Sequence, residues 1–443
     1  MEVKLLMAVL AGMVSLLIMI LRLKWPAFVA LLIAAIITGL AAGMDPPLVM
    51  DAIKTGMGGT LGFVATVVGL GAIFGGILEH TRGSQALAGF LLNAIGERRA
   101  PLALMITGLL VAIPIFFDVG FIILFPIVVA LHRKTGRSVL LYALPLLSGL
   151  AVSHAFIPPT PGPLAVADII GAPLGMVVLI GAIAGAPAAL AGLLYSRWLA
   201  NRIHIDVPAP IPTAAEAPDL PLPGIGWVLP ILLLPIALIV FHTLFDAEIL
   251  NTGNPQYDAL LMMVSHPFSA LILANLLAWY GLGRRAGLTQ TQLADISARS
   301  LAPAGIILLV TGAGGVFKQV LVDTGAGEML AKAVQDTGLG LVSFAFLAAA
   351  LIRVLQGSAT VAMITGAGLV APLLPAYALT EVQLAALVIA IASGGTVASH
   401  LNDSGFWLVK EFMGLSEKEG IQSWTVASTC IGLTGYLMAL IIF

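Results

Sequence analysis

The side chains in this sequence that could do chemistry are the few ionisable ones inside long apolar segments. Asp118 lies in an interruption at 114–120, and Arg353 comes just before a second interruption at 356–360. A charged group surrounded by apolar sequence is costly, and it usually faces a water-filled cavity or a charged partner. A guanidinium stays charged when partly desolvated and can hold a carboxylate through two hydrogen bonds. Arg353 is therefore the best candidate for binding an acid.

Two histidines open two further interruptions. His154 begins a stretch that ends in four prolines within 158–163, which no continuous helix can contain. His400 begins the corresponding stretch 400–406 in the second half of the chain. Histidine titrates near neutrality, and a carboxylate in a low-dielectric cavity is easier to protonate than one in water. The candidates for proton coupling are therefore the protonatable side chains of these stretches: Asp118, His154, His400 and Asp403.

Interrupted helices offer a way to hold an anion without a cluster of cations. Where a helix unwinds inside an apolar segment, backbone N–H groups are exposed at one half-helix and carbonyl groups at the other. Hydroxyl and amide side chains at the breaks would add hydrogen bonds, and that donor set suits a polyhydroxylated acid. Besides Arg353, the predicted substrate-binding residues are Ser153, Thr160, Ser358, Thr360, Asn402 and Ser404.

The ionisable residues among these also have a purely structural interpretation. Asp118 and Asp403 are of the type that caps helix N-termini. His154 and His400 could bind backbone groups freed by the breaks, and Arg353 could pair with a buried carboxylate without touching a substrate. The residue types alone leave these alternatives open.

The composition identifies the elements that must hold these residues. The 443-residue chain is 60% hydrophobic and 9% charged, whereas globular domains carry about 25% charged residues, so it is predicted to be an integral membrane protein. A net charge of -2 argues against nucleic acid binding, and a single cysteine, Cys430, excludes a disulfide framework. The sequence has no Gly-Lys dipeptide, no His-Glu-x-x-His and no Gly-x-Ser-x-Gly, so neither an enzyme, a metal site nor a cofactor is expected.

Apolar windows long enough to cross a bilayer recur along the whole chain. Segments 101–131 and 339–376 are too long for one span and are interrupted in the middle, so we interpret both as re-entrant hairpins. An all-α fold with about ten spans, two re-entrant hairpins and two broken helices is predicted. The spans are expected at 5–21, 25–43, 60–79, 139–160, 174–196, 225–245, 258–281, 301–322, 381–399 and 421–443.

An internal repeat divides these spans into two halves. Gly69, Gly71 and Phe74 recur at constant spacing as Gly312, Gly314 and Phe317, and Ser148-Gly149 recurs as Ser393-Gly394. Lys and Arg concentrate on one side if the N-terminus is outside the cell, and an odd number of spans in each half then makes the halves inverted. The predicted domains are a first repeat at 1–203, with a hairpin at about 101–131 and a broken helix at about 153–163; a Pro-rich cytoplasmic linker at 204–224; and a second repeat at 225–443, with a hairpin at about 339–376 and a broken helix at about 399–406.

Five short motifs resemble those of the bacterial gluconate permease family. The resemblance covers nearly the whole chain, and the last two motifs are the most specific because polar residues are rare in a membrane span. The motifs are Gly-Gly-Ile-Leu-Glu at 75–79, Phe-Phe-Asp-Val-Gly-Phe at 116–121, the His154 stretch at 154–163, Gly-Ser-Ala-Thr-Val-Ala at 357–362, and His-Leu-Asn-Asp-Ser-Gly-Phe-Trp at 400–407.

The resemblance implies a symporter of the bacterial inner membrane that imports gluconate or a related sugar acid with protons. It also implies membership of the ion-transporter superfamily. For this chain the resemblance then implies a homodimer with a fixed scaffold and a transport domain that moves as an elevator. Similar proteins carry other hydroxylated acids or D-serine, so the substrate within this set stays open. From the residues alone, a gradient-independent anion channel or uniporter and a receptor without transport are the alternatives.

Overall fold

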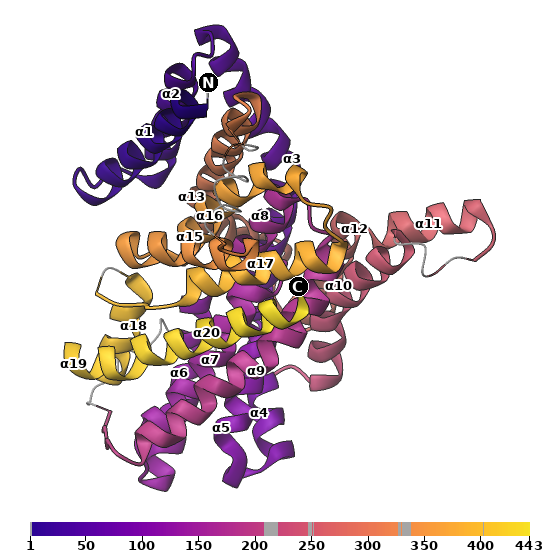
Figure 1. The fold of residues 1–443 in the computed structure, drawn as a ribbon. Coiled ribbons are helices and arrows are strands. Elements are labelled where there is room, and N and C mark those ends of the chain that lie inside the picture. Colours follow the sequence, from indigo (N-terminus) through magenta and orange to yellow (C-terminus); the bar gives the residue numbers. More distant parts are fainter. Residues whose placement is uncertain are drawn as a thin grey trace.

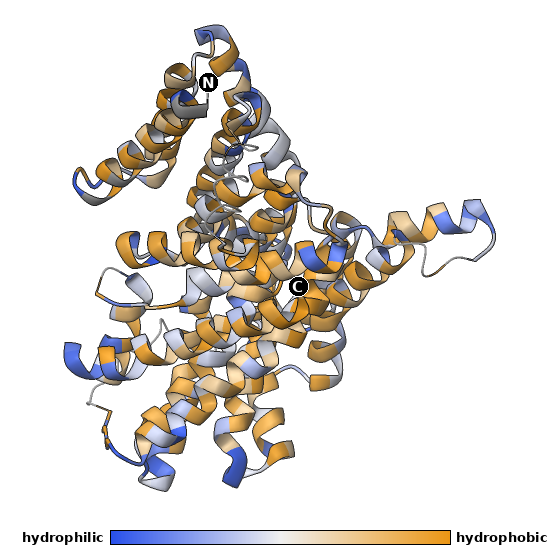
Figure 2. Ribbon diagram, in the orientation of Figure 1, coloured by the Kyte–Doolittle hydropathy of each residue, from blue (hydrophilic) through white to orange (hydrophobic). Residues whose placement is uncertain are grey.

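The fold is all-helical, as the sequence predicts. A computed structural model describes residues 2–207, 220–246, 250, 252–326, 329, 338–401 and 403–443, and every regular element in these ranges is a helix (Figure 1). Most of the predicted linker, 208–219, lies outside the described residues. Hydrophobic residues cover most of the helix lengths and hydrophilic ones gather at helix ends (Figure 2), which is the pattern of a protein embedded in lipid.

The first half contains nine α-helices among its described residues. The long α3 is followed by the short α4 and by two pairs of shorter helices, α5 with α6 and α7 with α8. The bounds are α1 Glu2–Leu21, α2 Ala27–Ala42, α3 Pro46–His80, α4 Gly83–Ile95, α5 Ala100–Val111, α6 Phe117–Thr135, α7 Leu140–Phe156, α8 Pro161–Ile170 and α9 Leu174–Ala200, with a 3-10 turn, η1, at Glu97–Arg99.

The second half has a similar order of long and short helices. Its bounds are α10 Ile225–Asp246, α11 Pro255–Ser265, α12 Pro267–Leu277, α13 Gln290–Asp323, α15 Leu341–Gln356, α16 Ala359–Val370, α17 Glu381–Thr396, α18 Ser404–Met413, α19 Glu417–Gly420 and α20 Val426–Ile442. Shorter π or 3-10 segments continue some of them: η2 Ala278–Arg284, η3 Ala371–Ala376 and η4 Ile421–Thr425.

Fewer helices than predicted are long enough to span a membrane on their own. Seven described helices pass by length and composition, or eight if the bent pair α11 and α12 counts as one span. The apolar stretch Lys4–Ile20 of α1 and the helices α2, α15 and α17 are shorter. The count of ten spans, the re-entrant course of the hairpins and the inverted relation of the halves therefore stay predictions.

Two helices are longer than the sequence pattern predicts, and one predicted span is bent. The spans expected at 60–79 and 301–322 belong to α3 and α13, which begin at Pro46 and Gln290. The span expected at 258–281 bends by 58° between α11 and α12. Pro267 has no N–H to continue α11, and the His266 ring accepts a hydrogen bond from the Phe268 N–H at 3.2 Å, so a new helix starts there.

The long helices α3 and α13 pack along each other and join the two halves. Their crossing depends on glycine: a Cβ atom at Gly56 would lie 2.6 Å from the carbonyl oxygen of Gly315, and one at Gly315 would lie 2.6 Å from the carbonyl oxygen of Gly56. Both obstacles are backbone atoms, which cannot move aside as a flexible side chain can. Small residues at such a crossing let two backbones approach closely inside lipid.

Substitution Gly56→Ala is expected to lower the thermal stability of the detergent-purified protein, because overpacking of this kind costs about 1–3 kcal/mol. The matched control is Gly58→Ala on the same helix, where an added Cβ meets no heavy atom within 4 Å. Alanine favours a helix over glycine by about 1 kcal/mol, so the control should melt no lower than the wild type. Equal melting temperatures of the two variants in scanning fluorimetry would contradict the tight crossing.

Candidate ligand-binding cavity

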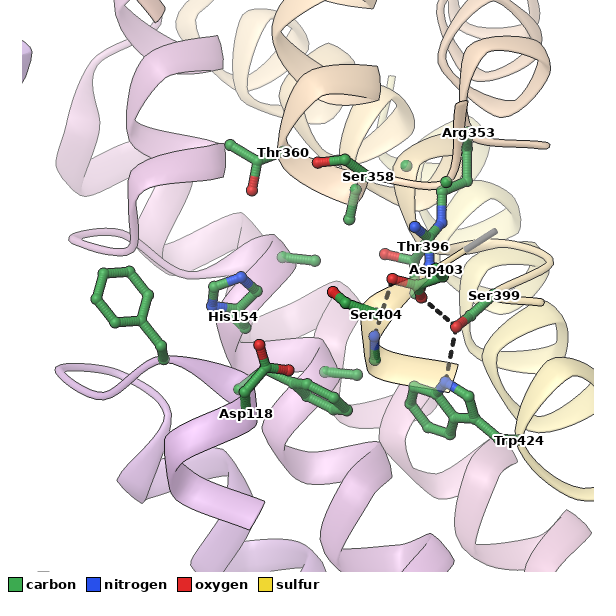
Figure 3. A pocket seen from close by; sticks show the side chains of 18 of the residues that line it. Asp118, His154, Arg353, Ser358, Thr360, Thr396, Ser399, Asp403, Ser404 and Trp424 are labelled. Atoms are coloured by element: carbon green, nitrogen blue, oxygen red, sulfur yellow. Dashed lines mark hydrogen bonds and ion pairs between the residues drawn. The ribbon is translucent and has the colours of Figure 1, made fainter. Parts of the chain in front are cut away.

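A cavity of about 540 Å³ lies where interrupted helices of both halves meet (Figure 3). Three helices begin at its wall: α6 after Phe116, α16 after Ser358 and α18 after Asp403. Three others, α7, α15 and α17, end there. Free N–H groups and the positive ends of helix dipoles at the three N-termini make the cavity suited to an anion.

The tip between α15 and α16 shows how the sequence makes such a break. Gly357 ends α15 in the left-handed conformation, with φ of 92°, which costs glycine little. The Ser358 N–H donates to Gln356 Oε1 at 2.9 Å, and the Ser358 hydroxyl accepts from the Val361 N–H at 3.3 Å. These contacts restart the helix at Ala359, with Thr360 in its first turn at the cavity wall.

The central charged contact of the cavity is an ion pair between Arg353 and Asp403. Arg353 Nη2 lies 2.5 Å from Asp403 Oδ2, and the two side chains are only 4% and 14% exposed. Asp403 Oδ2 also accepts a hydrogen bond from the Ser399 hydroxyl, and Asp403 Oδ1 accepts from the Gly405 N–H at 3.1 Å. Asp403 therefore caps α18 and neutralises Arg353 at once. These are the contacts of the structural alternative, and the substrate role of Arg353 and the coupling role of Asp403 stay predictions.

Some polar atoms at the cavity are buried without partners. Nε and Nη1 of Arg353 and Nδ1 of His154 have no hydrogen-bond partner among the described residues. Most buried polar atoms in proteins are hydrogen-bonded, so unpaired ones at a cavity are where a ligand or water would bind. Asp118 faces the same space from the first turn of α6 (Figure 3).

The structure brings together seven of the eleven residues singled out from the sequence. Those that line the cavity are Asp118, His154, Arg353, Ser358, Thr360, Asp403 and Ser404.

Three predicted residues do not line it, and Asn402 lies outside the described residues. Thr160 donates to the Ile157 carbonyl at 2.7 Å and borders a separate void of about 20 Å³, and His400 Nε2 lies 3.0 Å from the Val354 carbonyl. Ser153 is buried away from the cavity wall. The hydrogen bond between His400 and a backbone carbonyl fits the structural interpretation of that residue, and the Thr160 hydroxyl likewise binds the chain itself.

Sequence reasoning missed two residues that hold Asp403. The Ser399 hydroxyl accepts a hydrogen bond from Trp424 Nε1 at 2.7 Å and donates one to Asp403 Oδ2. Phe117 stacks on Trp424 at 5.5 Å between ring centroids. Ser399 lies one residue before the His400 stretch, and Trp424 lies in the last predicted apolar span. Nothing local in the sequence signals that these distant residues meet.

Interrupted helices around a cavity in a helical membrane protein are the architecture of a secondary transporter. Two solved structures share the fold. Neisseria gonorrhoeae MtrF, described as one of a class of antimetabolite efflux pumps, has a TM-score of 0.65 and 14% identity over 94% of each chain. The YdaH transporter of Alcanivorax borkumensis has a TM-score of 0.65 and 16% identity, covering 94% of this chain and 96% of its own.

The chain belongs to the GntP permease family, whose model matches residues 4–443. Among similar proteins, the low-affinity gluconate transporter of Escherichia coli K12 is 38% identical over 429 residues, 97% of this chain and 96% of the relative. The gluconate permease of Pseudomonas aeruginosa is 36% identical, covering 99% and 97% of the two chains, and the Gnt-II system L-idonate transporter of E. coli K12 is 36% identical, covering 98% and 97%. The resemblance seen in the motifs is confirmed, and the chain is a permease, not an enzyme.

Substitution Arg353→Met should strongly destabilise the protein, because it leaves the Asp403 carboxylate buried without a cation, at a cost of about 3–5 kcal/mol. The double variant Arg353→Met with Asp403→Asn removes both charges and should recover most of that loss. Thermal melts of the wild type and the two variants measure this. A single variant as stable as the wild type, or a double variant no better than the single, would contradict a strong buried pair.

Proposed function

We propose that this permease imports gluconate or a related sugar acid across the bacterial inner membrane by proton symport. The names of its relatives support this substrate class, since gluconate and L-idonate are both six-carbon hydroxylated monocarboxylates. In this proposal the halves 1–203 and 225–443 are inverted repeats, the linker 204–224 is cytoplasmic, and the protein is a homodimer.

The observation that carries the substrate proposal is the donor set of the cavity. One buried guanidinium, three helix N-termini and the hydroxyls of Ser358, Thr360 and Ser404 surround a space of about 540 Å³. Small-molecule sites are typically clefts of about 300–1,000 Å³ with few, well-placed polar groups. A carboxylate would bind at the guanidinium, and the substrate hydroxyls would bind the hydroxyl side chains and free N–H groups.

The proposal of proton coupling rests on the groups that share this cavity. Asp118, His154 and Asp403 all border it, so a proton carried by one of them would lie close to the bound acid. We further propose that the cavity moves across the membrane as an elevator, with the hairpins α5–α6 and α15–α16 closing it from opposite sides.

Purified protein in liposomes should accumulate gluconate when the outside is more acidic than the inside, and a proton ionophore should abolish the accumulation. The panel includes L-idonate, D-serine and uncharged glucitol, of which glucitol should not be taken up because it has no carboxylate for Arg353. Uptake that the ionophore leaves unchanged would indicate a channel or uniporter instead. Uptake that follows a sodium gradient would contradict proton coupling, and binding without uptake would indicate a receptor.

Loss of the guanidinium should abolish acid binding. The double variant Arg353→Gln with Asp403→Asn keeps the buried site neutral, so a loss of binding in it is not due to an unpaired charge. We expect the affinity for gluconate to fall about a hundredfold or more, because each hydrogen bond to a charged group contributes about 1.5–3 kcal/mol. The control, Arg299→Gln, removes an arginine whose side chain is 81% exposed and should bind normally. Near-normal affinity of the double variant in calorimetry would assign Arg353 a structural role.

A further inference from the structure

The hydrogen bonds around Asp403 form a complete carboxylate-binding site. Its two oxygens accept from three donors, namely Arg353 Nη2, the Ser399 hydroxyl and the Gly405 N–H. Ser399 is itself oriented by Trp424 Nε1 at 2.7 Å. A guanidinium, a hydroxyl and an N–H at a helix N-terminus are the donors that a substrate carboxylate needs. In the structure a carboxylate of the chain itself occupies them.

Arg353 still has unused hydrogen-bonding capacity beside Asp403. Two of its nitrogens, Nε and Nη1, are buried and unpaired within the described parts of the chain, although the residue lines the cavity. A second carboxylate that arrived from the cavity would bind the same guanidinium at Nη2 in place of Asp403, or at Nε and Nη1 once these are uncovered. The two carboxylates would then compete for one cation.

The net charge of the buried site determines which carboxylate binds Arg353. Arg353 and ionised Asp403 together are neutral, so a bound monoanion leaves one excess negative charge in a buried site, which is costly. One proton on Asp403 removes that excess. Protonation of Asp403 also weakens its hydrogen bond with Arg353, because a neutral carboxyl group is a poorer acceptor than a carboxylate.

The other charged and titratable groups near the pair form no ion pair with Arg353 or Asp403 among the described residues. Asp118 and His154 face the cavity from α6 and α7, and neither has an ion-pair partner among the described residues. His400 is bound to the Val354 carbonyl. On α18, Lys410 binds Glu411, and the packed α19 carries Glu417, Lys418 and Glu419 outside the cavity.

We propose that Asp403 stands in for the substrate carboxylate on Arg353 in the empty site, and that each acid anion binds together with a proton that Asp403 accepts. This inference rests on the proposed function and assigns the coupling to one residue. Because binding then takes up a proton, affinity is highest at acidic pH and falls as the pH rises.

The test is isothermal titration calorimetry of purified protein with gluconate between pH 5.5 and 8, in pairs of buffers with different ionisation enthalpies. The wild type should take up about one proton per gluconate, and its affinity should fall about tenfold per pH unit at the alkaline end. Asp403→Asn should take up none and bind with an affinity that does not depend on pH. Gluconate should also raise its melting temperature more than that of the wild type, because the ligand replaces the missing partner of Arg353.

Two other aspartates serve as comparisons. Asp168→Asn changes an aspartate of α8 that does not line the cavity, and it should keep the proton uptake of the wild type. Asp118→Asn changes the other carboxylate of the cavity and shows which of the two aspartates accepts the proton. Proton uptake that persists in Asp403→Asn, or that disappears in Asp118→Asn instead, would overturn the inference.

If Asp403→Asn does not fold, Ser399→Ala gives an independent test. It removes one hydrogen bond to the carboxylate, which favours the protonated form, so the pH midpoint of gluconate binding should move up by about half a pH unit. An unchanged midpoint would overturn the inference. A wild type that binds no sugar acid at any pH would refute the proposed function, whereas pH-dependent binding indifferent to Asp403 and Ser399 would refute this inference alone.

Discussion

A guanidinium inside a membrane protein must have a partner of opposite charge, and this constraint organises the cavity. Arg353 is 4% exposed, and its partner Asp403 comes from a different helix of the same half. To meet it, α17 must stop at Thr396 so that the chain can turn back and restart at Ser404. Asp403 therefore both caps α18 and balances the charge of Arg353, and the break between α17 and α18 puts it in place. The N-terminus of α18, where the Gly405 N–H binds Asp403, also lines the cavity.

Close backbone packing holds the interrupted helices in register. A Cβ atom at Gly149 of α7 would lie 2.0 Å from the Met105 carbonyl oxygen of α5, and one at Gly394 of α17 would lie 2.2 Å from the Phe346 carbonyl oxygen of α15. Gly149 and Gly394 are equivalent positions in the proposed repeat. Each lets the helix that ends at the cavity touch the first arm of the hairpin in its own half. The equivalent contacts are what a duplicated unit would give, and they support the proposal of two repeats.

The sequence predicts the breaks well because their causes are local. The prolines after His154 and the Gly357-Ser358 pair interrupt a helix whatever surrounds them, so the places where the cavity forms can be read from the chain. The bend at Pro267 was missed because a hydropathy average does not register one proline in an apolar window. The bond from Trp424 to Ser399 joins residues that only the folded structure brings together, and no pattern in the sequence contains it. Thr160 has the right residue type at a break, yet its hydroxyl binds the chain itself.

The most direct test of substrate binding in this cavity is a cryo-EM or crystal structure of the protein with bound gluconate. Ligand density is expected in the cavity between Asp118 and Arg353, with the gluconate carboxylate on the Arg353 guanidinium and its hydroxyls near Ser358, Thr360 and Ser404. Density for gluconate elsewhere in the protein, with the Arg353–Asp403 pair closed off from it, would contradict the claim that the interrupted helices of the two halves enclose the substrate.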